Sequence, residues 1–149
     1  MQDFSLPSTH GTFRFSDARG HWLVLYFYPK DNTPGCTVEG GDFRDLHAEF
    51  ARLGARVAGI SRDSLASHER FSAQLGLPFA LLADSDSTVC TLFNVIKSKK
   101  MYGKDVVGIQ RSTFLFDPAG TLRQEWRGVR SEGHAQAVLE TLKALQEKA

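Results

Sequence analysis

Apolar residues in this chain occur partly in short continuous runs and partly at helical spacing, which predicts alternating strands and helices. The longest apolar run covers residues 22–28 and is typical of a strand buried on both faces. Residues 4–15 contain the turn signal His10-Gly11 and predict a small hairpin. Further strands are expected at residues 55–61, 79–82, 112–116 and 121–126.

Four segments predict helices. Phe43, Leu46, Phe50 and Leu53 follow a helical period and predict a helix over residues 36–53 that ends at Gly54. The others are expected at residues 64–75 (capped by Asp63 or Ser64), 87–93 and 133–149. Residues 97–104 are rich in lysine and are expected to form a surface loop.

The expected order is β-α-β-α-β-α-β-β-α. Early strand–helix alternation requires parallel neighbouring strands, and a late hairpin would add antiparallel strands to the same sheet. This order predicts an α/β fold of the thioredoxin-like kind, a mixed central sheet with helices on both faces. The chain has 149 residues, and a single domain over residues 1–149 is expected.

Composition excludes several classes. Hydrophobic residues make up 42% and the net charge is +1, so a disordered chain, a nucleic-acid partner and an acidic membrane partner are not expected. No apolar run approaches the roughly 20 residues of a membrane span. Residues 1–4 carry an acid and no apolar stretch, which predicts no secretion signal and a cytoplasmic protein. The two cysteines are too few for a disulfide scaffold.

One segment concentrates the chemistry. Cys36 follows a proline-bounded loop at residues 29–35 and is expected to open a helix. The helix N-terminus favours a thiolate by only about 0.3–1 kcal/mol, up to about 2, so a cation is needed beside it. Arg111 is the candidate. An isolated cysteine is usually an inert apolar residue, but two prolines, a glycine and a threonine before Cys36 argue against that here.

The pattern Pro29-x-x-x-Thr33-x-x-Cys36, followed by a distant Arg111, resembles the active site of peroxiredoxins. The flanking segments 26–31, 33–39, 100–104 and 108–114 resemble the branch of bacterioferritin comigratory protein, or peroxiredoxin Q. The resemblance covers nearly the whole chain, with several motifs in the same order.

The resemblance implies a role for each motif residue. Cys36 would be the peroxidatic cysteine, Thr33 would hold the peroxide, and Arg111 would favour the thiolate and bind the peroxide. Pro29 would cover the thiolate, and the backbone N–H groups of Gly35 and Cys36 would complete the oxygen-binding site. No metal and no organic cofactor would be needed.

The implied function is a thiol-dependent peroxidase that reduces hydrogen peroxide and organic hydroperoxides in antioxidant defence and redox homeostasis. Thioredoxin, glutaredoxin or a small thiol would recycle it, and a monomer is expected. The alternative is a non-catalytic redox-sensing or chaperone-like binding protein of the same fold, which has no need for Thr33 and Arg111. A dithiol exchanger is disfavoured because the chain has no Cys-x-x-Cys motif.

The chain departs from the family at both usual resolving positions, which are here Gly41 and Ser72. Three alternatives remain open. The protein uses an external thiol, or Cys36 pairs with Cys90, or a position such as Ser72 or Gly41 carries an engineered replacement of a natural cysteine. Cys90 follows the third strand of the alternating region among apolar residues, and a structural thiol is favoured there.

Ordinary structural roles are expected for other residues near Cys36 and for the histidines. Glu39 is expected to form hydrogen bonds that orient the loop, and Gly40 and Gly41 are expected to ease unwinding of the helix after Cys36. The histidines lack metal-ligand spacing and are expected at the surface or in packing. They are His10, His21, His47, His68 and His134.

Overall fold

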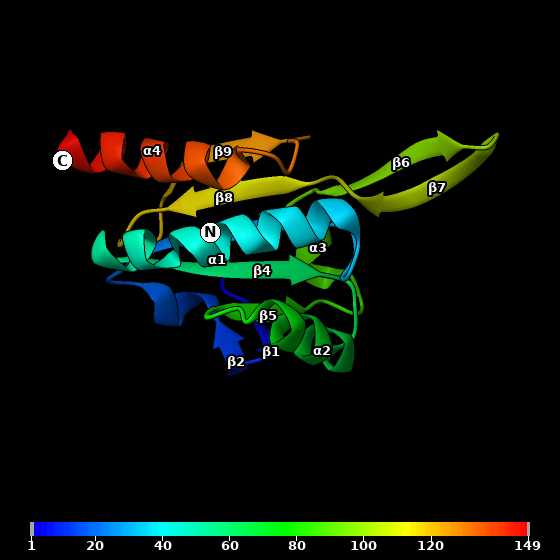
Figure 1. Cartoon of the computed structure of the whole chain (residues 1–149), viewed down its shortest axis with the longest axis horizontal. Helices are drawn as coiled ribbons and strands as arrows, with labels where there is room; N and C mark the ends of the chain where they lie inside the picture. Colours follow the sequence, from blue (N-terminus) through cyan, green and yellow to red (C-terminus); the bar gives the residue numbers. More distant parts are fainter. Residues whose placement is uncertain (1, 149) are drawn as a thin grey trace.

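The computed structural model describes residues 2–148, except for the side chains of Lys99 and Met101. A seven-stranded sheet runs through the molecule in the order β2-β1-β5-β4-β3-β8-β9 (Figure 1). Its strands are β1 (Ser5–Ser8), β2 (Gly11–Arg14), β3 (Trp22–Phe27), β4 (Ala55–Ser61), β5 (Ala80–Ala83), β8 (Ser112–Phe116) and β9 (Leu122–Arg127).

Strand directions confirm the mixed sheet that the sequence predicts. β3 pairs in parallel with β4, and β4 with β5, as the strand–helix alternation requires. β8 is antiparallel to β3 and β9 is antiparallel to β8, so the late hairpin extends the same sheet. The N-terminal hairpin of β1 and β2 joins the other side through β5.

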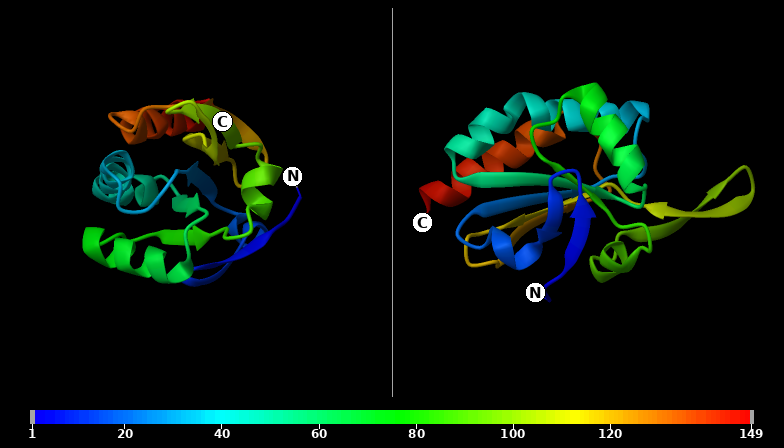
Figure 2. Two further views of the ribbon diagram at one scale, coloured as in Figure 1. Left: turned by 90° about the vertical axis from the view of Figure 1, so that its right-hand side faces the viewer. Right: turned by 90° about the horizontal axis from the view of Figure 1, so that it is seen from below.

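Helices cover both faces of the sheet (Figure 2). The helical elements are η1 (Phe15–Ala18), α1 (Pro34–Arg52), α2 (Leu65–Leu75), α3 (Thr88–Leu92) and α4 (His134–Glu147). Side chains alternate along β3, so Val24 and Tyr26 join one core cluster with α1, α2 and α4. Leu25 and Phe27 join the opposite cluster with η1 and α3. Among residues 2–148, no helix combines the length and apolar character needed to cross a bilayer.

Helix α1 begins earlier than the sequence predicts. Thr33 is the N-cap and Pro34 is the first helical residue, where its fixed φ and missing N–H suit the helix start. The prediction that Cys36 opens the helix was therefore wrong by two residues. Cys36 still lies in the first turn, whose N–H groups have no partner within the helix.

The lysine-rich segment 97–104 is not a loop. Strands β6 (Ile96–Met101) and β7 (Lys104–Ile109) form an antiparallel hairpin that projects beyond the main sheet (Figure 1). Tyr102 and Gly103 turn the hairpin with φ of 53° and 76°, as a two-residue turn of the mirror-image type requires. Both strands carry exposed polar side chains, so no alternation of apolar residues predicted them.

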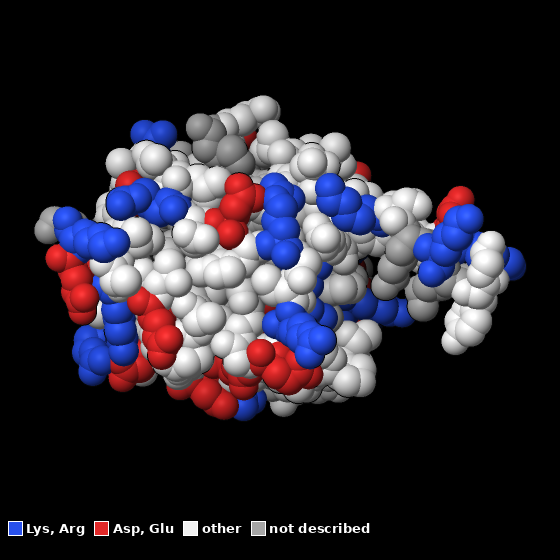
Figure 3. Space-filling model, turned by 90° about the horizontal axis from the view of Figure 1, so that it is seen from above, with Lys and Arg blue, Asp and Glu red and all other residues white. Residues whose placement is uncertain are grey.

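Charges are mixed on the face seen in Figure 3. Lysine and arginine side chains are interspersed there with aspartate and glutamate, and basic side chains also occupy the projecting hairpin. This face therefore carries no extended field of one sign.

Candidate active site

Cys36 lies where β3, the following loop and the first turn of α1 meet. Its side chain is buried, only 2% exposed, and belongs to the cluster that contains Tyr26, Tyr28 and Phe43. Thr33 caps the helix by backbone geometry alone, since its side chain makes no capping hydrogen bond. The N-terminus of α1 is therefore not neutralised by a capping carboxylate.

Arg111 immediately precedes β8 and is brought to Cys36 across 75 residues of sequence. Its Nη2 atom donates to Cys36 Sγ at 3.4 Å. Gly35 leaves room for this approach, since a Cβ atom there would make a tight contact of 3.1 Å with Arg111 Nη2. The structure thus brings together Cys36, Gly35 and Arg111, three of the residues that the motif singled out.

Glu39 fixes the other side of the guanidinium. Its side chain is fully buried, and Oε1 accepts from Arg111 Nη1 at 2.6 Å. Burial raises the pKa of Glu39 to about 7, although the charge of Arg111 and this hydrogen bond act in the opposite direction. Glu39 Oε2 has no hydrogen-bond partner within the described residues. Glu39 therefore orients Arg111. The sequence predicted instead that Glu39 orients the loop.

Thr33 and Pro29 occupy the loop before α1. The Thr33 hydroxyl donates to the carbonyl oxygen of Lys30 at 2.9 Å, and the side chain is half-buried. Pro29 is exposed and lines a shallow hollow with residues of the loops after β4 and β5, including Arg62 and Asp63. Roles for Thr33 in holding peroxide and for Pro29 in covering the thiolate stay predictions.

Cys90 lies on the other side of the sheet. It is fully buried in α3, in the cluster that packs against Leu25 and Phe27. Burial, together with the hydrogen bond and charge of Asp84, holds the pKa of the Cys90 thiol well above its usual range. This environment keeps Cys90 as a neutral thiol.

The two positions at which the resemblance places resolving cysteines are on helices α1 and α2. Gly41 is in the second turn of α1, and Ser72 is half-buried in the last turn of α2. Both helices cover the face on which Cys36 lies.

Sequence reasoning missed several polar residues around the site. His134 is buried and its Nε2 lies 2.7 Å from Thr113 Oγ1. Burial and the charge of Arg111 lower the pKa of His134 to about 4, which keeps the ring neutral. Asp31 and His68 form a buried pair beneath the loop. Spacing gave no signal for these contacts, because each joins elements that are distant in sequence.

Comparison with known proteins shows the family to which this chain belongs. Residues 1–125 match the AhpC/TSA family. Peroxiredoxin Bcp of Xanthomonas campestris is 58% identical over 125 residues, covering 84% of this chain and 78% of the relative. Peroxiredoxin Bcp of Bacillus subtilis is 48% identical over 147 residues, covering 98% and 94%.

Solved structures of similar proteins show the same family and the same overall fold. The structure of the bacterioferritin comigratory protein of X. campestris superposes with a TM-score of 0.90 at 52% identity, covering 95% of this chain and 90% of that one. Peroxidoxin BcpB of Mycobacterium tuberculosis gives a TM-score of 0.85 at 34% identity, covering 97% and 94%. The resemblance, the thioredoxin-like fold and the thiol-dependent peroxidase activity that the sequence predicted are confirmed: this chain belongs to the AhpC/TSA family and is a peroxiredoxin.

Proposed function

We propose that Cys36 is the peroxidatic cysteine and that Arg111 and Glu39 form its electrostatic support. The observation that carries this proposal is the guanidinium of Arg111, which donates one N–H to Cys36 Sγ and another to Glu39 Oε1. A cation 3.4 Å from the sulfur favours a thiolate over a thiol, and the thiolate is the nucleophile. Glu39 keeps the guanidinium in place, so no reorganisation is needed during the reaction.

The reaction is a nucleophilic displacement on oxygen. The thiolate of Cys36 attacks one peroxide oxygen, an S–O bond forms and the O–O bond breaks. The leaving oxygen takes up a proton and departs as water or an alcohol, leaving a sulfenic acid on Cys36. Arg111 stabilises the charge that moves onto the leaving oxygen, and the backbone N–H groups of Gly35 and Cys36 donate to the peroxide.

Thr33 and Pro29 complete this proposal. The Thr33 hydroxyl lies at the N-cap of α1 and donates to the Lys30 carbonyl oxygen. When substrate binds, this hydroxyl would rotate from Lys30 to the peroxide. Pro29 would limit access of water to the loop. A metal or organic cofactor has no step in this reaction, because sulfur supplies the nucleophile.

Reduction of the sulfenic acid requires an external thiol. One thiol condenses with the sulfenic acid to a mixed disulfide and releases water, and a second thiol displaces Cys36. Cys90 is unsuited to this task because it is buried on the opposite face of the sheet from Cys36. Thioredoxin, glutaredoxin or a small thiol would serve as the reductant.

Ser72 is informative for this step. Two solved cysteine-to-serine variants of X. campestris peroxiredoxin Q change positions that are 36 residues apart. Cys36 and Ser72 have the same separation. This supports an assignment of Ser72 to the place of a second redox cysteine in that relative, and therefore a one-cysteine cycle in this chain.

The substrates would be hydrogen peroxide and organic hydroperoxides. The X. campestris bacterioferritin comigratory protein has been analysed for alkyl peroxide reduction, which supports the organic part of this range. We assign the protein to the cytoplasm as a single-domain monomer that contributes to antioxidant defence and redox homeostasis.

The direct experiment compares the wild-type protein with Cys36→Ser in peroxide consumption with dithiothreitol or thioredoxin as reductant. Cys36→Ser should abolish turnover and keep the fold, because serine forms no comparable anion at neutral pH. Cys90→Ser is the matched control and should retain turnover. Substantial turnover by folded Cys36→Ser would refute the assignment of Cys36.

A further inference from the structure

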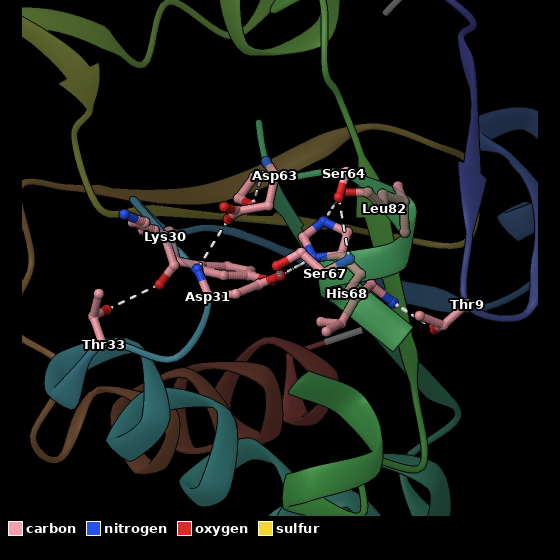
Figure 4. A network of polar contacts seen from close by, with 12 residues as sticks. Thr9, Lys30, Asp31, Thr33, Asp63, Ser64, Ser67, His68 and Leu82 are labelled. Atoms are coloured by element: carbon pink, nitrogen blue, oxygen red, sulfur yellow. Dashed lines mark hydrogen bonds and ion pairs between the residues drawn. The ribbon is translucent and has the colours of Figure 1, made fainter. Parts of the chain in front are cut away.

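A buried histidine of α2 lies beneath the loop that precedes Cys36 (Figure 4). His68 is fully buried, with Nδ1 at 2.7 Å from Asp31 Oδ2 and Nε2 at 2.8 Å from the carbonyl oxygen of Leu82. A carbonyl oxygen and a carboxylate only accept hydrogen bonds, so both ring nitrogens are satisfied when both carry hydrogen. In this geometry both ring nitrogens of His68 therefore act as donors, and the Nδ1 contact pairs His68 with the buried Asp31.

The Asp31 carboxylate collects further donors. Its Oδ1 accepts from the Tyr28 hydroxyl at 2.6 Å, and Oδ2 accepts from Ser67 Oγ at 2.8 Å. Burial acts to raise the pKa of Asp31, but the hydrogen bonds from His68 and Tyr28 outweigh it and leave the pKa below its ordinary value. The carboxylate is thus charged and held both by Tyr28, the residue after β3, and by α2.

The backbone of Asp31 is fixed as well. Its N–H donates to Asp63 Oδ2 at 2.9 Å, and the same oxygen accepts from Ser61 Oγ at 2.6 Å. Side chain and backbone of Asp31 therefore have partners just after β3, on α2 and in the β4–α2 connection. Within residues 29–33, Asp31 is the point at which the loop is tied to the rest of the fold.

This anchor is two residues from the N-cap of α1. Thr33 Oγ1 donates to the carbonyl oxygen of Lys30 at 2.9 Å, and the carbonyl oxygen of Thr33 accepts from Thr37 N–H at 2.8 Å. A displacement of Asp31 would thus move the Thr33 hydroxyl and the first turn that carries Cys36.

Two carboxylates and one imidazole, those of Asp31, Asp63 and His68, also have the composition of a metal site. Ligand atoms of Asp31, Asp63 and His68 lie within 4.8 Å of one another. A metal ion would need a deprotonated His68 nitrogen and the oxygens that now accept hydrogen bonds. The donors already present satisfy these atoms, so the cluster is accounted for as a hydrogen-bonded anchor.

We infer that His68 is a positioning residue for the peroxidase reaction, because its buried ion pair with Asp31 holds the loop that sets Thr33 and the first turn of α1 around Cys36. This inference rests on the proposed role of Cys36. Displacing reacting groups by about 1 Å can slow an enzyme about 100-fold, so an anchor of this kind has a kinetic signature.

The test separates two single-turnover reactions of Cys36. Oxidation by hydrogen peroxide needs the assembled oxygen-binding site, whereas alkylation by iodoacetamide needs only an accessible thiolate. In His68→Asn, oxidation should slow about 10- to 100-fold while alkylation changes less than about threefold, since Arg111 and Glu39 are untouched. His47→Asn is the matched control, a partly buried histidine of α1 outside the network, and should leave both rates unchanged.

Two outcomes would overturn the inference. One is an oxidation rate of folded His68→Asn within about twofold of wild type, and the other is an equal fall of oxidation and alkylation, as a purely structural role predicts. If His68→Asn does not fold, Ser67→Ala removes one donor to Asp31 and should give the same split at a smaller amplitude. Equal oxidation of Cys36→Ser and wild type would instead refute the proposed function, so the two failures are distinguishable.

Discussion

Cys36 and Cys90 are both buried in a helix, yet the charged side chains beside them have opposite signs. At α1 the N-cap side chain makes no capping bond, and the guanidinium of Arg111 donates to the sulfur at 3.4 Å. At α3 the N–H groups of Val89 and Cys90 donate to the carboxylate of Asp84, at 3.1 and 2.7 Å. The same residue type is therefore placed beside a cation at one helix and beside an anion at the other.

Burial is common to both cysteines, so in our proposal the charge beside each sulfur, and not its burial, separates the reactive cysteine from the inert one. A thiolate is favoured by an unfilled helix N-terminus and a nearby cation. A carboxylate that already fills the helix N-terminus favours the neutral thiol.

Removal of the cation should have the largest effect. Arg111→Ala should slow the reaction of Cys36 with peroxide by about 100- to 1000-fold, since it removes a preorganised donor from the developing charge. It also leaves the buried Glu39 without its partner, which is expected to cost about 3–5 kcal/mol of stability. Stopped-flow oxidation and urea unfolding measure the two effects.

Arg111→Lys is the companion variant. Lysine supplies a point charge without the planar fork, so it should restore part of the rate and cannot contact Cys36 and Glu39 in the same geometry. Equal rates for Arg111→Ala and wild type would show that the contrast between the two cysteines does not depend on this cation.

Glu39 should make stability depend on pH. Its pKa in the folded protein is about 7 against an ordinary value of 4.5, so the folded state holds this proton more tightly than the unfolded state. The stabilising contribution is full below pH 4.5 and is lost as pH rises toward 7. Glu39→Gln keeps the hydrogen bond to Arg111 without titrating.

Urea unfolding of both proteins at several pH values measures this difference. The stability of wild type relative to Glu39→Gln should fall between pH 4.5 and 7 and stay level outside that window. A difference that is independent of pH would mean that Glu39 has the same pKa in the folded and the unfolded protein.

Replacement of the inert thiol should leave the chemistry intact. Cys90→Ala should retain peroxide turnover within about twofold and lower the free energy of unfolding by about 1–2 kcal/mol, because it leaves a small cavity in a filled core. Steady-state turnover and thermal unfolding are the measurements. A loss of reductant-dependent turnover in a folded Cys90→Ala would assign Cys90 a part in the cycle.

The smallest effect concerns the helix that carries Cys36. A Cβ atom at Gly41 would lie 3.5 Å from Arg44 Nη2, an ordinary contact, whereas one at Gly40 would lie 3.3 Å from Leu75 Cδ1. Gly41→Ala should therefore stabilise the protein by up to about 1 kcal/mol and slow amide exchange of residues 38–42, and Gly40→Ala should gain less. Unchanged exchange in Gly41→Ala would count against easy unwinding there.

The strand, loop and helix around Cys36 were predictable from the local pattern of apolar, proline and glycine residues. The continuous apolar run predicted β3, and the helical period of Phe43, Leu46 and Phe50 predicted α1, the helix whose first turn contains Cys36. The loop before Cys36 was marked by its prolines and glycine. The contact of Arg111 with Cys36 was not predictable in this way, because it spans 75 residues and has no local signal. The resemblance to the family motif pointed to Arg111.

Other features were missed for identifiable reasons. The β6–β7 hairpin has exposed lysines on both strands, so hydrophobic alternation was absent. The pairing of Glu39 with Arg111 and of His68 with Asp31 depends on how α1, α2 and β8 pack around the loop. A buried polar pair of this kind is a tertiary property, and a scattered histidine gives no sign of it in the sequence.

The most direct measurement is mass spectrometry of the reduced protein after one equivalent of hydrogen peroxide, without reductant. The proposed chemistry predicts oxygen adducts on Cys36 or an intermolecular disulfide through Cys36, with Cys90 unmodified. An intramolecular Cys36–Cys90 disulfide formed as fast as peroxide is consumed, or oxidation of Cys90 with Cys36 intact, would contradict it.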